Sequence, residues 1–453
     1  MLNFPRACRL QLLELPVQNN KIKVHEFEQR GIMSRVLLHS LVFSPDGNST
    51  AYLMTELAVE LKRLGHQVTV LTTTPHYNII PAVAARQIMR RYWIGLLYYS
   101  EVDGIPVWHV KVPHKGNRVW MRVFDYIRFH IVSLAAAMFK IETQDIVIAT
   151  SPPLTIAVMS WLLGSWWNAP SVYKVAELYP DVAIRQGIVK NRAFIAFLNW
   201  LEKFIYKKNT MIVPIAEQFM RVIRKRGVPE NKLQMIPDFV DTKFYCPKTR
   251  TNEFSLKHRL QQDFIVLYAC NIGIVHDLDS VLFAAENLSK YAIRFVLVGD
   301  GSKKDWIQKE IENRNLKNII LLGYQPKELM PEINASCDIS IIPMNMAGSK
   351  DGVPSKIYSI FSCAKPIIAL VDDESELRWI AKQSGCGRVV PIGDRQAFSN
   401  AILNAFHERK SLPAEGMKGR EYVEANYSKE AIAFKYHELI EALQHKRNHN
   451  VHQ

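Results

Sequence analysis

The sequence predicts an α/β protein built from two doubly wound, parallel-sheet domains that face each other across a cleft. Its 453 residues exceed what one ordinary hydrophobic core organises, so two domains of roughly 200 residues each are expected. From Ser34 onward, apolar runs of strand length alternate with amphipathic helical periods, which is the pattern of β–α–β units. The rhythm breaks at residues 235–252, where two prolines among polar residues predict an interdomain linker.

The first domain, residues 34–234, opens with a β–α–β unit. RVLLHSLVF predicts a buried strand, AYLMTELAVELKRLG an amphipathic helix and HQVTVLTTT the next strand. Further strands are expected at DIVIATS, SVYKVAE and TMIVPIA, with helices over 154–167 and 192–206. Residues 1–33 show no sustained hydrophobic period, so we expect a disordered arm or an over-called translation start there.

The second domain, residues 253–426, repeats the alternation. Strands are expected at FIVLYACNIG, IRFVLVGDG, NIILLGY, DISIIPM and KPIIALV, with helices between them. Residues 427–445 predict a closing helix that packs back toward the first domain, followed by a tail over 446–453. Open α/β sheets bind ligands at the carboxyl ends of their strands, so the cleft between two such Rossmann-like domains is the expected site.

The composition limits the classes of binding partner but does not identify a single class. The 57 basic and 43 acidic residues give a net charge of +14, which favours nucleic acid, an anionic lipid surface or a phosphorylated small molecule. The six cysteines contain no C-x-x-C pair, so reduced thiols and no zinc site are expected. The longest apolar run, 154–167, is shorter than the roughly 20 residues that a membrane-spanning helix needs.

One short stretch, SKDGVPSKIYSIFSCAKPII, concentrates polar chemistry at the start of an apolar helix. Lys350, Asp351, Ser355 and Lys356 lie in its Gly/Pro-containing turn. A helix N-terminus presents unpaired N–H groups and partial positive charge, so this turn could bind a phosphate or a sugar hydroxyl. The alternative is a capped surface helix in which Ser355 serves as the N-cap.

Five segments, in this order, resemble the retaining glycosyltransferases of family 4 (group 1), which have the GT-B fold of two Rossmann-like domains. They are SPDGNST, MIPDFVDTKFYCP, LYACNIGIVHDLDSVLFAA, FVLVGDGS and VPSKIYSIFSCAKPIIAL. ELYPDVA and VPSK are most similar to the subgroup that transfers amino or deoxyamino sugars, such as N-acetylfucosamine, during bacterial surface-polysaccharide assembly. The resemblance implies a nucleotide-sugar donor, a UDP-sugar by preference, a lipid-linked or glycan acceptor, and neither cofactor nor metal.

The resemblance also implies roles for individual residues. It assigns leaving-group and sugar chemistry to Lys356 and Asp351, and acceptor chemistry to Glu177, for which a structural ion pair is the alternative. For donor binding it implies Asn271, Gly273, His276, Gly299, Asp300, Gly301, Ser355 and Ser359, although the GDG turn at 299–301 could equally be turn chemistry alone. For the sugar and acceptor cleft it implies Gly47, Asn48, Ser49 and Asp181, although Gly47 and Asn48 could simply form a loop.

The sequence departs from the family pattern at the diphosphate. Asn271 and His276 stand where many members have an arginine and a lysine, and the family's paired glutamates fall on Asp351 and Ser359. A serine has a single side-chain oxygen, so Ser359 cannot contact the ribose hydroxyls with two oxygens as a glutamate does. Lys356 is therefore the principal expected cation for the diphosphate, with Lys350 in reserve.

The first domain also suggests a membrane contact. Between Arg86 and Arg128, basic residues alternate with Tyr and Trp, a combination that suits an anionic lipid surface. The basic residues are Arg90, Arg91, Lys111, Lys115, Arg118 and Arg122. We expect a cytoplasmic protein, peripheral on the inner membrane face, although the apolar side of the helix predicted near residue 120 could equally be core.

Four alternatives compete with an active transferase. The charge is accompanied by no RNA- or DNA-binding motif, which argues against a nucleic-acid partner. The GDG turn lacks the third glycine of a dinucleotide fingerprint, which argues against a dehydrogenase. A non-catalytic GT-B protein that binds a glycan or a partner, and a non-hydrolysing sugar-nucleotide epimerase, remain open.

Overall fold

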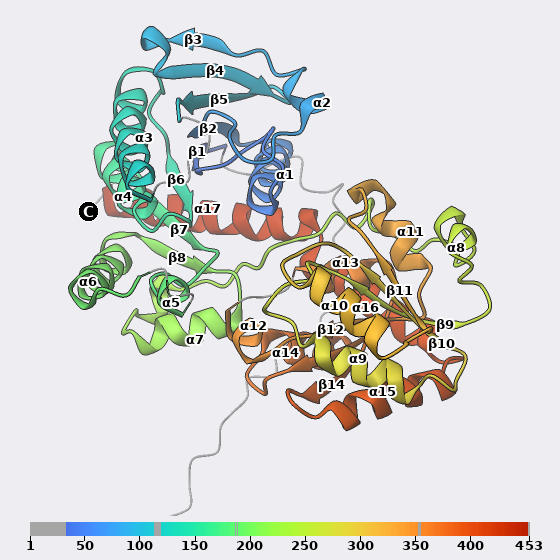
Figure 1. Cartoon of the computed structure of the whole chain (residues 1–453). Coiled ribbons are helices and arrows are strands. Elements are labelled where there is room, and N and C mark those ends of the chain that lie inside the picture. Colours follow the sequence, from blue (N-terminus) through green and yellow to red (C-terminus); the bar gives the residue numbers. More distant parts are fainter. Residues whose placement is uncertain (1–32, 113–118, 186, 188, 352–354, 452–453) are drawn as a thin grey trace, which may run out of the picture. The chain divides into compact units, whose positions relative to one another are not determined.

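The computed structural model describes residues 33–112, 119–185, 187, 189–351 and 355–451 (Figure 1). The expected arm at residues 1–33 lies outside the described residues, apart from Met33. The remaining chain forms two α/β lobes, each built on one open sheet. We call the lobe that contains β1 to β8 the N-lobe and the lobe that contains β9 to β14 the C-lobe.

The N-lobe sheet has the strand order β3-β4-β5-β2-β1-β6-β7-β8. The strands from β5 to β8 in this order pair in parallel. Leu37 of β1, for example, lies opposite Thr69 of β2 and Val147 of β6. β3, β4 and β5 instead pair antiparallel and extend the sheet on one side, which the sequence analysis did not foresee. The strands are β1 Arg35–His39, β2 Gln67–Thr73, β3 Arg90–Tyr92, β4 Leu97–Val102, β5 Ile105–Val110, β6 Ile146–Thr150, β7 Ser171–Val175 and β8 Met211–Pro214.

Helices cover both faces of this sheet. α1 begins where Asn48 caps its first turn and buries Met54, Leu57 and Leu61 against the sheet. The helices are α1 Ser49–Arg63, α2 Pro81–Ala84, η2 Trp93–Gly95, α3 Val119–Phe139, α4 Ile156–Trp166, α5 Asp181–Arg185, α6 Arg192–Lys208, α7 Glu217–Lys225 and η3 Glu230–Lys232.

The C-lobe sheet is entirely parallel, with the order β11-β10-β9-β12-β13-β14. Its strands are β9 Phe264–Ala269, β10 Ile293–Val298, β11 Ile319–Leu322, β12 Ile339–Pro343, β13 Ile367–Val371 and β14 Arg388–Pro391. Its helices are α8 Glu253–Lys257, α9 Leu278–Asn287, α10 Lys304–Asn313, η4 Lys327–Leu329, α11 Met330–Ala335, α12 Met346–Asp351, α13 Lys356–Ser362, α14 Glu376–Ser384, α15 Arg395–His407 and α16 Leu412–Tyr427.

The last helix, α17 Lys429–Val451, belongs to the core of the N-lobe. Ile432, Tyr436 and Ile440 are fully buried in the cluster that also contains the apolar faces of α1, β1 and β2. The helix continues as far as Val451, into the tail that was predicted over 446–453.

The chain crosses between the lobes twice, and the two crossings are joined. The N–H of Val240, on the outgoing crossing, donates to the carbonyl of Tyr427, on the returning one, at 2.9 Å. Beside them, the Lys429 amine lies 3.0 Å from the Glu56 carboxylate and 3.3 Å from that of Asp241. Burial opposes the charge of Lys429, but the two carboxylates outweigh burial and raise its pKa.

Four histidines are held neutral inside the N-lobe and its contact with α17. Burial lowers the pKa of His39 to about 3 and those of His66, His109 and His130 to about 4. His39 is fully buried beside Phe129, and neither of its ring nitrogens has a hydrogen-bond partner. These rings remain unprotonated in the folded protein, whereas they would bind protons below about pH 6.5 once unfolded.

Lowering the pH from about 7.5 to about 5.5 should therefore reduce the free energy of unfolding, because protons bind the unfolded chain preferentially. Each buried histidine contributes at most about 1.4 kcal/mol per pH unit below its unfolded pKa. Urea unfolding at both pH values measures this slope. His39→Leu should reduce the slope by one histidine's share, whereas His407→Gln, at the exposed end of α15, should leave it unchanged. Equal slopes for His39→Leu and wild type would contradict this assignment.

Candidate functional site

Two adjoining cavities open at the carboxyl ends of the sheet strands. The interlobe cavity, about 490 Å³, lies among the loop after β1, α1, the linker and residues of the C-lobe. The C-lobe cavity, about 390 Å³, lies beyond β9, β10 and β11. Tyr245, Lys327, Lys356 and Ser359 line both cavities, so a ligand that fills one would contact the side chains that border the other.

The N-lobe wall of the interlobe cavity is the loop between β1 and α1. The Asp46 carboxylate holds this loop by accepting hydrogen bonds from the N–H groups of His76 and Tyr77, at 2.9 and 2.8 Å. A Cβ on Gly47 would lie 2.3 Å from the carbonyl oxygen of Asn78, so a larger residue would displace the loop. Three of the predicted residues, Gly47, Asn48 and Ser49, line this cavity.

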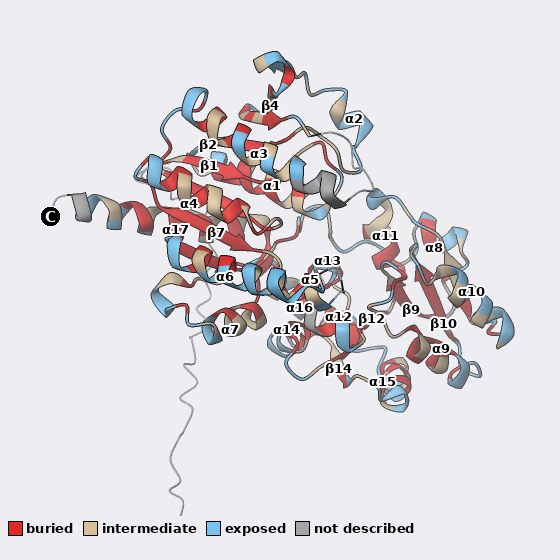
Figure 2. Ribbon diagram, turned by 60° about the vertical axis from the view of Figure 1, so that its left-hand side comes forward, coloured by how far each residue is buried: buried red, intermediate tan, exposed pale blue. Residues whose placement is uncertain are grey.

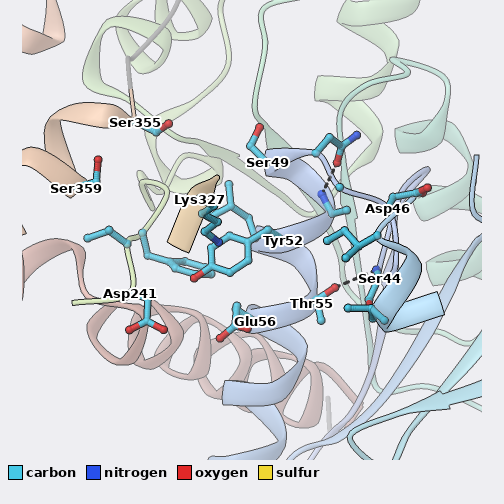
Figure 3. Close-up of a pocket in the computed structure, with 18 of the residues that line it drawn as sticks. Ser44, Asp46, Ser49, Tyr52, Thr55, Glu56, Asp241, Lys327, Ser355 and Ser359 are labelled. Atoms are coloured by element: carbon cyan, nitrogen blue, oxygen red, sulfur yellow. Dashed lines mark hydrogen bonds between the residues drawn. The ribbon is translucent and has the colours of Figure 1, made fainter. Parts of the chain in front are cut away.

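Lys327 reaches across the interlobe cavity from the C-lobe. Its ammonium lies 3.8 Å from the centroid of the Tyr52 ring on α1, with Glu56 and Asp241 nearby (Figure 3). Desolvation lowers the pKa of Lys327, and the two carboxylates offset part of that effect. The sequence analysis missed this residue, although Lys327 begins η4, shortly after the carboxyl end of β11, and ligands of open α/β sheets bind at that edge.

The C-lobe cavity is bounded by the loop after β9. The Tyr268 hydroxyl donates to the Asn271 carbonyl at 2.7 Å and lies 3.1 Å from His276 Nδ1. His276 Nε2 lies 3.6 Å from the Cys270 sulfur. Among the predicted donor residues of this loop, Asn271 lines the cavity, whereas Gly273 and His276 stand behind it.

The GDG turn after β10 packs closely on the loop after β9. Cβ atoms on Gly299 and Gly301 would lie 2.0 Å from the Cys270 carbonyl oxygen and 2.4 Å from the Ile272 carbonyl oxygen, and both glycines have positive φ. Gly299 and Asp300 line the C-lobe cavity, and Gly301 does not. Turn geometry therefore requires the glycines whether or not they also contact a ligand.

Lys356 lines both cavities, and its side chain contacts the end of β9. Its amine donates to the Ala269 carbonyl at 3.0 Å, and the Ser359 hydroxyl donates to the Lys356 carbonyl at 2.9 Å. Ser355 lines the interlobe cavity but makes no side-chain capping hydrogen bond, so the predicted N-cap alternative is not observed. The side chains of Lys350 and Asp351 lie outside the described part of the molecule.

Cys270 follows the last residue of β9 and lies near Lys356 and His276. Burial opposes its ionisation, but the hydrogen bond from His276 and the positive charge of Lys356 outweigh burial and lower the pKa of the thiol. Burial and the neighbouring thiol together raise the pKa of Tyr268. The cavity therefore holds a thiol whose charge near neutral pH competes with any bound anion for Lys356.

The two acceptor-side candidates after β7 lie apart from both cavities. Asp181 forms an ion pair with Arg226, which also pairs with Glu202. Glu177 is half-buried. Burial raises its pKa, and the hydrogen bond from Tyr179, which lowers the pKa, offsets only part of that effect. The structure thus brings together the predicted residues of the β1 loop, the β9 loop and α13, and leaves Asp181 in an ion pair of the N-lobe.

The arrangement suits transfer between two ligands. Two lysine side chains lie at the boundary of adjoining cavities, where they can stabilise negative charge that develops as a phosphorylated group leaves. A second ligand in the interlobe cavity would then be held beside the bond that breaks.

Solved structures with this architecture are GT-B enzymes. Sucrose-phosphate synthase from Thermosynechococcus elongatus matches with a TM-score of 0.68 at 15% identity, covering 90% of this chain and 99% of its own. HepE from Anabaena in complex with UDP matches with a TM-score of 0.67 at 12% identity, covering 90% and 100%. The chain therefore has the GT-B fold.

Sequence comparison refines this class. Residues 250–422 match the model of the glycosyl transferases group 1, and residues 50–238 match that of the glycosyl transferase 4-like domain. The putative colanic acid biosynthesis glycosyl transferase WcaI of Escherichia coli K12 is 21% identical over 88% of this chain and 97% of its own length. The probable glycosyltransferase WbjE of Pseudomonas aeruginosa is 23% identical over 63% and 71%. The C-lobe therefore matches the group 1 glycosyltransferases, and the N-lobe matches the glycosyl transferase 4-like domain.

Lys356→Ala should lower kcat/KM on the order of 100-fold, because it removes a charge at the boundary of the two cavities. The free energy of unfolding should change by less than about 0.5 kcal/mol, because the side chain is exposed. Steady-state kinetics and urea unfolding measure the two effects. Lys382→Ala, an exposed change on α14, is the matched control, and equal kinetics for the two variants would refute the role of Lys356.

Donor affinity should fall as the pH rises from about 6.5 to about 8.5, because the Cys270 thiolate forms in that range and competes with the donor diphosphate for Lys356. Isothermal titration with the nucleotide at each pH measures the effect. Cys270→Ser, which cannot ionise there, should bind with little pH dependence. The same pH profile in wild type and Cys270→Ser would show that this thiol does not influence donor binding.

Proposed function

We propose that this chain is a retaining glycosyltransferase that moves a sugar from a UDP-sugar to a lipid-linked or glycan acceptor in the assembly of a bacterial surface polysaccharide. The observation that supports it best is the sharing of Lys327, Lys356 and Ser359 by two adjoining cavities. The name of the relative WcaI supports the polysaccharide assignment, and the UDP complex of HepE supports the nucleotide.

The donor nucleotide would occupy the C-lobe cavity, with its diphosphate toward Lys356. The sequence lacks the basic pair that the family resemblance leads one to expect after β9, because Asn271 and His276 stand there. Lys327 supplies a second cation from a different strand, at the boundary that Lys356 also lines. The charge for the leaving diphosphate would thus come from the loops after β11 and before α13.

The transferred sugar and the acceptor hydroxyl would meet in the interlobe cavity, beside Asn48 and Ser49. Asp351, the last residue of α12, would accept hydrogen bonds from the sugar hydroxyls. Glu177, which does not line either cavity, would bind or deprotonate the acceptor as it approaches, and burial raises the pKa of this carboxyl, which favours its protonated form. The VPSK and ELYPDVA segments support a deoxyamino sugar of the N-acetylfucosamine type.

The proposal is tested by a nucleotide-sugar screen. A UDP-sugar at about 100 times its Kd should stabilise the folded chain by about 2.7 kcal/mol, and GDP- and ADP-sugars should not. NMR of the product formed with an acceptor glycolipid should show the donor's anomeric configuration. The absence of stabilisation by any nucleotide-sugar would refute the proposal.

Two other outcomes would replace it. Conversion of the UDP-sugar to an epimer without acceptor would identify an epimerase. Donor binding with neither transfer nor hydrolysis would identify a binding protein that shares the fold.

A further inference from the structure

Helix α3 bears two apolar stripes, and one of them faces outward. Its inner stripe, which includes Phe129, Val132 and Ala136, is buried against the sheet. On the opposite side, Phe124 and Ile131 are 64% and 62% exposed, and Ile127 and Met138 are exposed as well. A surface helix of a globular protein ordinarily has polar residues on its outer face, so the outer stripe suits a partner rather than water.

The neighbouring helices α4 and α6 extend the same apolar surface. α4, which packs beside α3 and α6, contains no charged residue, and Trp166 near its end is 62% exposed. On α6 the rings of Phe194, Phe197 and Trp200 stack in succession, and each is about half exposed. Figure 2 shows α6 largely pale blue beside α4. We call the outward residues of α3, α4 and α6 the three-helix face.

Charged side chains around the three-helix face are predominantly basic. Glu202 is the acidic residue of α6, and it is buried in its ion pair with Arg226. On α3, Asp125 is paired with Arg128. The exposed cations on and beside these helices are Lys140, Lys190, Arg192, Lys203, Lys207 and Lys208.

We propose that the three-helix face seats on an anionic phospholipid bilayer and that its aromatic side chains enter the headgroup region. Exposed aromatic and aliphatic residues with a basic border match the two attractions that hold a protein at such a surface. A protein partner would need an apolar patch bordered by acidic residues. An anionic bilayer has an apolar interior beneath negatively charged headgroups, so it matches both the apolar residues and their basic border. None of the described helices is long and apolar enough to cross a membrane, so the contact is peripheral.

This surface differs from the membrane segment expected from the sequence. Within that segment, Tyr92 and Tyr99 pack edge-on against Trp108, so these rings stabilise the antiparallel edge of the sheet. Arg90 and Arg91 are exposed on β3, whereas Arg118 and Arg122 are among the residues whose side chains the structure does not describe. The end of the expected segment overlaps the three-helix face, because Phe124 and Ile127 belong to both. The other exposed apolar side chains of the segment, Ile88, Ile94 and Leu96, lie in and around the β3–β4 connection. The rest of the face lies further along the chain, on α3, α4 and α6.

The position of the face deepens the proposed function, on which this part of the inference rests. Tyr126 of α3 lies close enough to Tyr179 to contribute to its raised pKa, and Tyr179 hydrogen bonds to Glu177. The first half of α3 therefore lies in the neighbourhood of the candidate acceptor residue. A lipid-linked acceptor held in the bilayer would reach Glu177 along this end of α3.

Vesicle sedimentation with the full chain tests the proposal. Wild type should sediment with vesicles of phosphatidylcholine mixed with phosphatidylglycerol, and weakly with phosphatidylcholine alone. Lys203→Glu combined with Lys207→Glu should weaken the binding at least about 30-fold, from about 1 kcal/mol per lysine removed. Phe197→Ser combined with Trp200→Ser should also weaken it at least about tenfold, with little dependence on salt.

Matched controls lie on the C-lobe. Lys309→Glu with Lys317→Glu changes the net charge equally, and Leu256→Ser with Met417→Ser removes exposed apolar side chains. Neither pair should alter vesicle binding. Absence of wild-type binding, or equal loss in the controls, would overturn the proposal.

Two further measurements separate the rival outcomes. Sedimentation velocity measures whether a second copy of the chain occupies the face instead. A wild-type dimer that does not bind vesicles, and that Phe197→Ser with Trp200→Ser converts to a monomer, would overturn the proposal. Donor affinity in solution should be the same in wild type and all these variants. Loss of vesicle binding with intact donor binding supports the lipid surface, whereas failure of donor binding in wild type would count against the proposed function alone.

Discussion

The cluster around Lys429 fixes how the two halves of the chain are connected. Its amine lies between the carboxylates of Glu56, on α1, and Asp241, on the linker, at the point where the chain returns to the N-lobe. The adjacent hydrogen bond from Val240 to Tyr427 ties the two crossings together. Because the loop before α1 and the linker both line the interlobe cavity, this one set of contacts positions two of its walls.

The distribution of positive charge in the site follows from backbone crowding after β9. Glycines at 299 and 301 allow the β10 turn to lie against the carbonyls of Cys270 and Ile272, and Tyr268 and His276 occupy the space behind. The two lysine side chains that line the C-lobe cavity come from elsewhere. Lys327 begins η4 and Lys356 begins α13, and both lie at the border with the interlobe cavity.

Periodicity was sufficient to predict the fold class and most of the parallel strands along the chain, because buried parallel strands are continuous apolar runs. It missed β14, a four-residue strand at the edge of the C-lobe sheet. It failed for β3, β4 and β5, whose alternating basic and aromatic residues were interpreted as a lipid-binding segment. In an antiparallel edge the same alternation places Tyr92, Tyr99 and Trp108 together on one face. Alternation alone does not distinguish these two uses.

The site was less accessible from the sequence than the fold. Motif positions indicated Lys356, Ser359 and the β1 loop, which do line the cavities, but their roles remain predictions. Lys327 was missed because its significance depends on the contact with Tyr52, which is far away in sequence. Asp181 was selected from its motif, whereas its partner Arg226 follows only from the placement of α5 beside the end of α7.

The incorporation of α17 into the N-lobe has a consequence for synthesis. Ile432, Tyr436 and Ile440 fill a core whose other members are among the first strands and helices to leave the ribosome. The N-lobe thus keeps an unfilled apolar surface while the whole C-lobe is translated. A nascent N-lobe must be protected from aggregation until its final helix emerges, so chaperone demand should depend on how rapidly the second half of the message is read.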